Sequence, residues 1–258
     1  MKIPYYQVDA FTNKVFGGNP AGVCPLDKWL DDSTLQAIAA EHNLSETAFY
    51  VPSDNHYELR WLTPNMEVDL CGHATLATAH VLYSEYGATD CLKFSTKSGL
   101  LAVNKEGNFL SMSFPSRQGV EVDISDELIA GLGSKPKQLY KSRDYLAVFD
   151  SEETVRQINP NAEALLKLDC LGIIATAPGS DVDFVSRFFA PSAGILEDPV
   201  TGSAHCTLIP YWSRRLQKQQ LEAKQISQRG GYLRCEDFGD RVKISGQAVT
   251  YCKGEINI

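Results

Sequence analysis

A single carboxylate between a predicted helix and a predicted strand is the residue of this sequence best suited to proton chemistry. Glu46 stands in NLSETAFY (43–50), with few cations near it along the chain. A carboxylate that is partly desolvated and lies near a second acid, for which Asp198 is a candidate, keeps its proton to higher pH and can exchange it near neutral pH. Most glutamates are instead solvated or cap a helix, so this interpretation depends on the residues that accompany Glu46.

Two similar passages place glycine at the start of an apolar helix. Gly72 and His73 begin one of these helices, and Gly202 and Ser203 begin the other. A helix N-terminus presents unpaired N–H groups and attracts anions, and glycine lets a ligand approach the backbone closely. Each glycine alone would more simply form a tight turn. The pairing favours one cleft that binds a small molecule carrying a carboxylate.

Other polar residues give weaker indications. Asn19, in the turn FGGNPAGV, could offer its amide to the ligand or could only form the turn. Cys71, at a helix N-terminus, could have a lowered thiol pKa, although most lone cysteines are packing residues. His73 and His80 lack carboxylate partners at metal-site spacing, so no metal is predicted. Ser203 is not in a G-x-S-x-G elbow, and neither a dinucleotide motif nor a phosphate loop occurs, so no cofactor is predicted.

Short strands, with few helices, must position these residues. Helical periodicity is clear at 31–43, 74–86 and 203–216. The segment 74–86 is apolar on nearly every side, so it is predicted to be a buried helix. In the segment 203–216 a kink is expected at Pro210. Runs rich in β-branched and aromatic residues predict strands at 3–11, 47–51, 57–63, 91–97, 100–104, 109–114, 170–176, 183–189, 241–246 and 248–252.

An internal repeat relates the two halves of the chain. RWLTP (60–64) and RFFAP (187–191) share one pattern and lie about half the chain length apart, and each leads through an acidic loop to a glycine-headed helix. VPSD (51–54) and APGSD (177–181) occupy matching places upstream. These matches favour a duplicated unit over coincidence. The repeat predicts two similar halves, each wrapping strands around a buried helix.

Composition excludes several classes of function. The chain has 258 residues and a net charge of −8, which disfavours binding to nucleic acid. Neither a signal peptide nor an apolar run long enough to span a membrane is evident. The seven cysteines include no C-x-x-C pair, which indicates reduced thiols and a cytoplasmic protein.

Four motifs, in order and spacing, resemble the PhzF-like family of phenazine-biosynthesis isomerases: DAFTNKVFGGNPAGV (9–23), NLSETAFY (43–50), LCGHATLATAHVL (70–82) and EDPVTGSAH (197–205). The resemblance covers nearly the whole chain. It implies an α+β fold like that of diaminopimelate epimerase, with two pseudo-symmetric lobes, each a curved mixed or antiparallel sheet around a central helix, and an active site between them. Lobes of 1–115 with 247–258, and of 116–246, are expected.

The resemblance also implies the roles of individual residues. Glu46 falls on the family's catalytic glutamate, which moves a proton between two substrate carbons. The expected substrate-binding residues are Asn19, Gly72, His73, Asp198, Gly202 and Ser203. The phenazine enzyme isomerises a dihydro-hydroxyanthranilate without a cofactor and acts as a homodimer, so a homodimer is implied here as well.

The chain departs from the phenazine enzymes at two positions. Ala74 replaces a common proline, and Cys71 stands where alanine is frequent, close to the place of a catalytic thiol in the epimerases. A two-thiol racemase also needs a second cysteine, and the second motif has Asp198-Pro199-Val200 instead. We therefore predict a cofactor-independent isomerase that uses Glu46 on a small carboxylate substrate. The alternatives are a Cys71-dependent racemase or epimerase, and a non-catalytic protein that binds a ligand or a partner.

Overall fold

The chain folds into two compact units. The computed structural model describes Met1–Ile258, and the first unit comprises Met1–Ser113 with Ser245–Ile258, while the second comprises Phe114–Ile244. Each junction lies two residues earlier than the boundaries expected from the sequence.

The sheet of the first unit is mixed. Its strands are β1 (Lys2–Ala10), β2 (Asn19–Pro25), β3 (Glu46–Pro52), β4 (Tyr57–Leu62), β5 (Glu67–Val68), β6 (Leu92–Thr96), β7 (Gly99–Glu106), β8 (Phe109–Pro115) and β18 (Ala248–Asn257). They pair in the order β18-β1-β2-β3-β4-β6-β7-β8, with β5 also on β4. The pairs β2–β3 and β4–β6 are parallel and the others are antiparallel.

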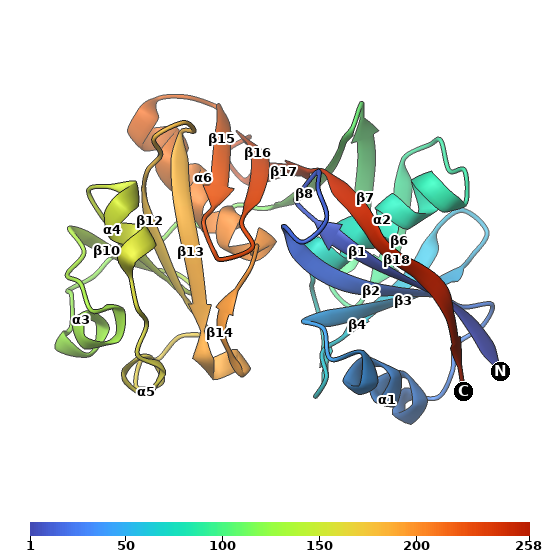
Figure 1. The fold of residues 1–258 in the computed structure, drawn as a ribbon. Coiled ribbons are helices and arrows are strands. Elements are labelled where there is room, and N and C mark those ends of the chain that lie inside the picture. The colour runs from blue at the N-terminus through green and yellow to red at the C-terminus, as the bar shows by residue number, and fades with distance from the viewer. The chain divides into compact units, whose positions relative to one another are not determined.

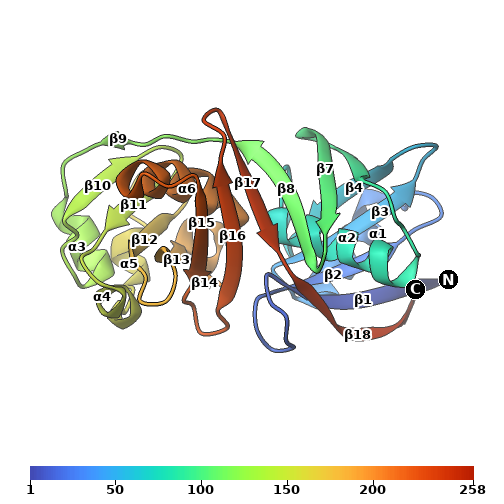
Figure 2. The ribbon, with the colours of Figure 1, turned by 90° about the horizontal axis from the view of Figure 1, so that it is seen from above.

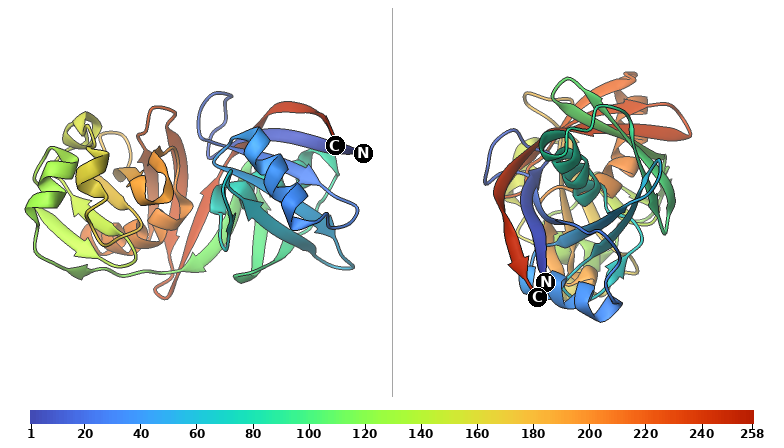
Figure 3. Two further views of the ribbon diagram at one scale, coloured as in Figure 1. Left: turned by 90° about the horizontal axis from the view of Figure 1, so that it is seen from below. Right: turned by 90° about the vertical axis from the view of Figure 1, so that its right-hand side faces the viewer.

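Two helices cover opposite sides of this sheet, as Figures 2 and 3 show. Helix α1 (Asp32–His42) begins at the Asp31 cap, which accepts a hydrogen bond from the Thr34 N–H, and packs Leu35 and Ile38 against β3. Helix α2 (Gly72–Glu85) contacts β1, β2, β3 and β18, and most of its residues are buried. The predicted central helix of this unit is therefore confirmed, and its apolar surface on all sides is explained by strands that surround it.

The second unit repeats this plan with shorter strands. Its elements are β9 (Val120–Glu121), α3 (Asp126–Leu132), β10 (Gln138–Lys141), β11 (Tyr145–Val148), α4 (Glu152–Gln157), α5 (Ala162–Leu165), β12 (Ile173–Pro178), β13 (Phe184–Ala190), η1 (Pro191–Ala193), β14 (Ile195–Asp198), α6 (Gly202–Leu216), β15 (Gln220–Gln225), β16 (Gly231–Asp237) and β17 (Arg241–Gly246) (Figure 1). Strands pair in the order β9-β10-β11-β12-β13-β15-β16, with β14 on β13.

Strand pairing makes the two units topologically equivalent. In each unit a parallel pair (β2–β3, β11–β12) is followed by an antiparallel strand (β4, β13) that pairs in parallel with the strand after the central helix (β6, β15). The registers align Arg60 with Arg187 and Glu67 with Glu197, since Leu62 faces Glu67 and Phe189 faces Glu197. The repeat inferred from RWLTP and RFFAP is therefore a repeat of structure.

Both units contain a bidentate ion pair between the aligned arginine and glutamate. Arg60 donates from Nε and Nη2 to the Glu67 carboxylate at 2.9 and 2.8 Å, and Arg187 donates in the same way to Glu197 at 2.7 and 2.8 Å. Each pair joins the strand before the acidic loop to the short strand within it. The arginine that begins each repeated motif thus holds the loop that leads to the central helix.

The predicted fold class, an α+β fold with two similar lobes, is confirmed. All three predicted helices occur, within two residues of the expected bounds, and α6 continues through Pro210. Each predicted strand coincides with an observed one, whereas β2 and most short strands of the second unit were not anticipated. Every helix in the chain is too short or too polar to cross a bilayer.

Candidate active site

Glu46 and His73 form a buried acid–imidazole pair in the first unit. Glu46 Oε2 lies 3.1 Å from His73 Nε2, and the two side chains are only 18% and 6% exposed. Beyond this ion-pair contact, neither atom has a hydrogen-bond partner within the chain. Buried polar atoms are nearly always hydrogen-bonded in proteins, so each exception requires an explanation.

Strand register brings this pair together. Glu46 is the first residue of β3, opposite Ala21 on the parallel strand β2, which begins at Asn19. His73 is the second residue of α2. Its Nδ1 lies 3.3 Å from the amide nitrogen of the buried Asn19 and 3.5 Å from Cys71 Sγ. Of the predicted residues, Asn19, Glu46, Gly72 and His73 are therefore all together.

The electrostatics of the pair favour a charged His73. Burial alone would lower the pKa of the imidazole, but the charge of the neighbouring Glu46 carboxylate acts in the opposite direction, and the pKa of His73 is raised well above its ordinary value. Burial and the nearby Glu46 carboxylate raise the pKa of the Cys71 thiol. The lowered thiol pKa considered for Cys71 is therefore wrong: desolvation outweighs the helix N-terminus.

The same three residues could be considered as metal ligands, since Glu46, Cys71 and His73 each place a ligand atom within 4.8 Å of the others. However, Glu46 faces Nε2 of the imidazole and Cys71 faces Nδ1. A histidine binds one ion through one nitrogen, in the ring plane. The donors do not converge on one nitrogen, so this geometry suits hydrogen bonding and proton transfer better than ion binding.

The acidic loop of the second unit is held by a buried polar network. The Thr201 hydroxyl donates to Asp198 Oδ2 at 2.6 Å, and the Gln225 amide donates to the Asp198 carbonyl at 2.7 Å. Gln225 Oε1 in turn accepts from the Thr201 N–H at 2.9 Å. Asp198 is only 9% exposed. These bonds fix the backbone that leads to Gly202, and neither Thr201 nor Gln225 was anticipated from the sequence.

Ser203 is held by an arginine that the sequence gave no reason to select. Arg143 Nη2 donates to Ser203 Oγ at 2.9 Å. The same guanidinium donates to Asp144, whose side chain is fully buried, with the shortest distance 2.9 Å. Arg143 lies two residues before β11, far from Ser203 along the chain. Only a three-dimensional arrangement could have identified this contact.

The two glycine-headed helices differ from the others at their N-termini. Side chains cap α1, α3, α4 and α5, whereas neither Cys71 nor Thr201 caps the helix that follows it. The N–H groups near Gly72 and Gly202 therefore lack the usual side-chain acceptor.

The other histidines of these helices have structural partners. His205 Nδ1 donates to the Thr201 carbonyl at 2.8 Å, and burial lowers the pKa of His205 to about 4. At the matching position of α2, the Thr75 hydroxyl donates to the Cys71 carbonyl at 2.6 Å. His80 Nε2 contacts the Thr250 hydroxyl at 3.1 Å.

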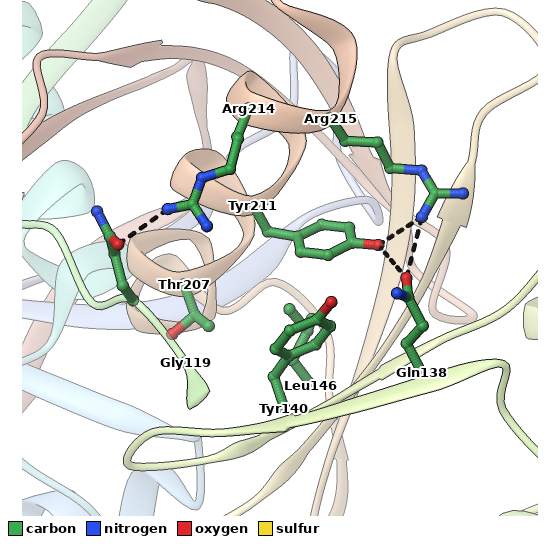
Figure 4. Close-up of a pocket in the computed structure, with 9 residues that line it drawn as sticks. Gly119, Gln138, Tyr140, Leu146, Thr207, Tyr211, Arg214 and Arg215 are labelled. Atoms are coloured by element: carbon green, nitrogen blue, oxygen red, sulfur yellow. Dashed lines mark hydrogen bonds between the residues drawn. The ribbon is translucent and has the colours of Figure 1, made fainter. Parts of the chain in front are cut away.

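A separate pocket of about 220 Å³ lies beside the C-terminal half of α6 (Figure 4). Arg214 donates to Gln118, and Arg215 donates to both Gln138 and Tyr211. None of the predicted site residues lines this pocket. Arginines in the last turn of a helix are stabilised by the helix dipole and require no ligand.

Two topologically equivalent units, each with a central helix, define the architectural class of this chain. A hydroxyproline epimerase from Agrobacterium vitis, crystallised with trans-4-hydroxy-L-proline, has the same fold, with a TM-score of 0.63 at 10% identity over 99% of this chain and 92% of that one. The chain thus has the fold of the proline and diaminopimelate epimerases.

Within this class, the chain belongs to the PhzC-PhzF family of phenazine biosynthesis-like proteins, which it matches over residues 8–254. An uncharacterized isomerase of Pseudomonas aeruginosa is 50% identical over 100% of both chains. The crystal structure of a PhzF-family protein from Enterococcus faecalis superimposes with a TM-score of 0.98, at 50% identity over 100% of both chains. The predicted family is confirmed, and the chain is an isomerase of this family.

Proposed function

We propose that this isomerase moves a proton between two carbons of a small carboxylate-bearing substrate without a cofactor, and that Glu46 is the general base and acid. The observation that carries this proposal is the buried ion pair of Glu46 Oε2 and His73 Nε2, 3.1 Å apart, in which neither atom has any other hydrogen-bond partner in the chain.

Such an arrangement is costly unless a ligand completes it. A buried polar atom without a partner costs roughly 1–3 kcal/mol, and more when it is charged. Glu46 Oε2 and His73 Nε2, at the start of β3 and the start of α2, have only each other, and a substrate can supply the remaining contacts. A carboxylate placed within reach of a bound substrate can act as its general base.

The reaction follows from these two side chains. Glu46 removes a proton from a carbon next to an unsaturated or carboxyl-bearing group, and the C–H electron pair enters the conjugated system. Glu46 then returns the proton to another carbon of the same molecule. Atoms and electrons balance within the substrate, so neither an oxidant nor a reductant is required.

His73 supplies the second part of the chemistry. Its protonated imidazole donates a hydrogen bond to the oxygen on which negative charge develops, while Cys71 Sγ lies on its Nδ1 side. Proton transfer by a placed side chain contributes about 10²–10⁴-fold. Orientation of the substrate must supply much of the remainder.

The alternative of a Cys71-dependent racemase is less well supported. Burial raises the pKa of Cys71, so the neutral thiol predominates near pH 7. The strand registers align Cys71 with Thr201, and they align Glu46 with Gly172. A two-base racemase needs a second acid–base residue, and neither equivalent position of the second unit holds one.

The remaining expectations stay part of the proposal. Asn19, Gly72 and His73 in the first unit, and Asp198, Gly202 and Ser203 in the second, are the proposed substrate-binding residues. The homodimer and the cytoplasmic location remain predictions.

The test is turnover in D₂O, beginning with dihydro-hydroxyanthranilate and continuing through small unsaturated carboxylates. We expect a product that carries solvent deuterium at one carbon. Binding without turnover would instead support the non-catalytic alternative. A substrate that is converted with no label under any condition would argue against a carboxylate that exchanges its proton with solvent.

A further inference from the structure

Ser203 and Arg143 have hydrogen-bond donors that no group in the chain accepts. Arg143 Nη2 donates to Ser203 Oγ. A guanidinium has only donors, so Ser203 must be the acceptor in this bond. The hydroxyl hydrogen of Ser203 then has to point elsewhere, and no acceptor for it occurs within the chain.

Asp144 fixes the orientation of Arg143. Its carboxylate, fully buried, faces the Nε and Nη2 edge of the guanidinium, at distances between 2.9 and 3.4 Å. The two Nη1 hydrogens of Arg143 have no partner in the chain. Three donors, two on Arg143 and one on Ser203, therefore remain beside a side chain that is locked in place.

The same contact exists in the first unit with different residues. The strand registers align Asn19 and Pro20, at the start of β2, with Ser142 and Arg143, which precede β11. They also align His73 with Ser203. In the first unit Asn19 contacts His73, and in the second Arg143 contacts Ser203. Each unit thus joins its strand end to the head of its central helix, but the second uses a cation.

The local charge also favours an anion. Asp144 balances Arg143, but Arg117 lies close by as a further cation, and its buried Nη1 has no hydrogen-bond partner. Both arginines act on Cys206, where they oppose the effect of burial, which raises the pKa of that thiol to about 11. This excess of positive charge stands out in a chain of net charge −8.

We propose that Arg143, oriented by Asp144, and Ser203 together bind a carboxylate at the head of α6, and that this site selects acids over their uncharged analogues. This inference rests on the proposed function for the nature of the substrate, but not on the role of Glu46. In this arrangement Asp144 is a positioning residue, since it acts through Arg143.

The experiment measures binding of benzoate, a small ring-bearing carboxylate, and of benzamide, its uncharged isostere, by titration calorimetry. The unaltered protein is expected to bind benzoate and to discriminate against benzamide. Arg143→Gln should weaken benzoate binding about ten- to a hundred-fold and leave benzamide unchanged, as expected for loss of a charged hydrogen bond. Arg143→Lys should restore part of the preference.

Matched variants separate binding from folding. Arg143→Gln leaves Asp144 buried without its partner, which is destabilising. The double variant Arg143→Gln/Asp144→Asn removes that charge, and it should melt near the unaltered protein yet still fail to prefer benzoate. Arg156→Gln, at an exposed arginine of α4, is the control and should bind normally.

Failure of this inference is distinguishable from failure of the proposed function. Absence of saturable benzoate binding by the unaltered protein, or equal affinity in the folded double variant, would overturn the role of Arg143. Glu46→Gln should still bind benzoate in an Arg143-dependent manner. If that variant also turned over substrate normally, the proposed function would fail while the carboxylate site remained.

Discussion

Replacement of Arg187 should lower the stability of the second unit by more than the loss of an exposed ion pair does. The guanidinium of Arg187 makes the bidentate contact to Glu197, and its Nη1 also donates to the carbonyls of Val155, Arg156 and Ile158 at 3.3, 3.2 and 2.7 Å. One side chain thus anchors both β14 and the C-terminal end of α4.

The magnitude follows from burial. The Arg187 and Glu197 side chains are 12% and 20% exposed. Loss of one partner of a buried pair costs about 3–5 kcal/mol, and exposed pairs contribute about 0–1 kcal/mol. For this largely buried pair, Arg187→Met should lower the free energy of unfolding by about 2–4 kcal/mol. Glu197→Gln should cost less, because an amide oxygen still accepts one hydrogen bond.

Urea denaturation followed by circular dichroism is the assay, with Lys137→Met as the control. Lys137 pairs with Asp150 at the surface, where the side chains are 67% and 69% exposed, so its loss should change stability by less than about 1 kcal/mol. An Arg187→Met protein as stable as the control would refute the structural role given to the repeated arginine.

Three further outcomes are expected. The pKa of His73 is raised in the folded protein, so the imidazole is cationic at pH values below that pKa. Activity should therefore fall as the pH rises through the His73 pKa, which lies above 6.5. In a pH–rate profile, His73→Gln should lose this alkaline limb. Arg60 lowers the pKa of Glu67 to about 2. The ionised Glu67 therefore stabilises the fold fully above its unfolded pKa near 4.5, and this stabilisation is lost as the pH falls toward 2. When the stability of Glu67→Gln is measured against pH, this acid-dependent loss should be absent. Cys71→Ser should keep most of the activity in a turnover assay, since a buried neutral thiol is not the base, and an inactive, folded Cys71→Ser would favour the racemase.

Long, patterned elements could be predicted from the sequence, and short ones could not. The central helix α2 and the strands with strong β-branched and aromatic content were evident because their residues are buried on the faces that the pattern requires. Strand β2 was missed because Pro20, Gly22 and Pro25 obscure the strand signal, although pairing with β1 and β3 imposes it. Strands β10, β11 and β14 of the second unit have only four residues each, too few for a clear alternation of apolar and polar residues.

The candidate site could be predicted only where its residues belong to one continuous motif. Motifs within continuous segments of the sequence were enough to propose Glu46, His73 and Ser203 as site residues. Arg143 and Asp144 stand outside every motif, and their proposed role depends on a contact between the residues before β11 and the head of α6, which requires the folded chain. The pKa of the Cys71 thiol is raised by burial, and the burial of Cys71 cannot be determined from the sequence around it.

The most direct test of the account is the rate of substrate C–H exchange with D₂O, measured by NMR, for the unaltered protein and for Glu46→Gln. This substitution keeps the size of the side chain and removes the base, and Glu41→Gln, at an exposed acid of α1, is its control. We predict exchange that is reduced by at least about 10²-fold in Glu46→Gln and is unchanged in the control. Exchange at the full rate in a folded Glu46→Gln protein would contradict the assignment of Glu46 as the proton-transferring group.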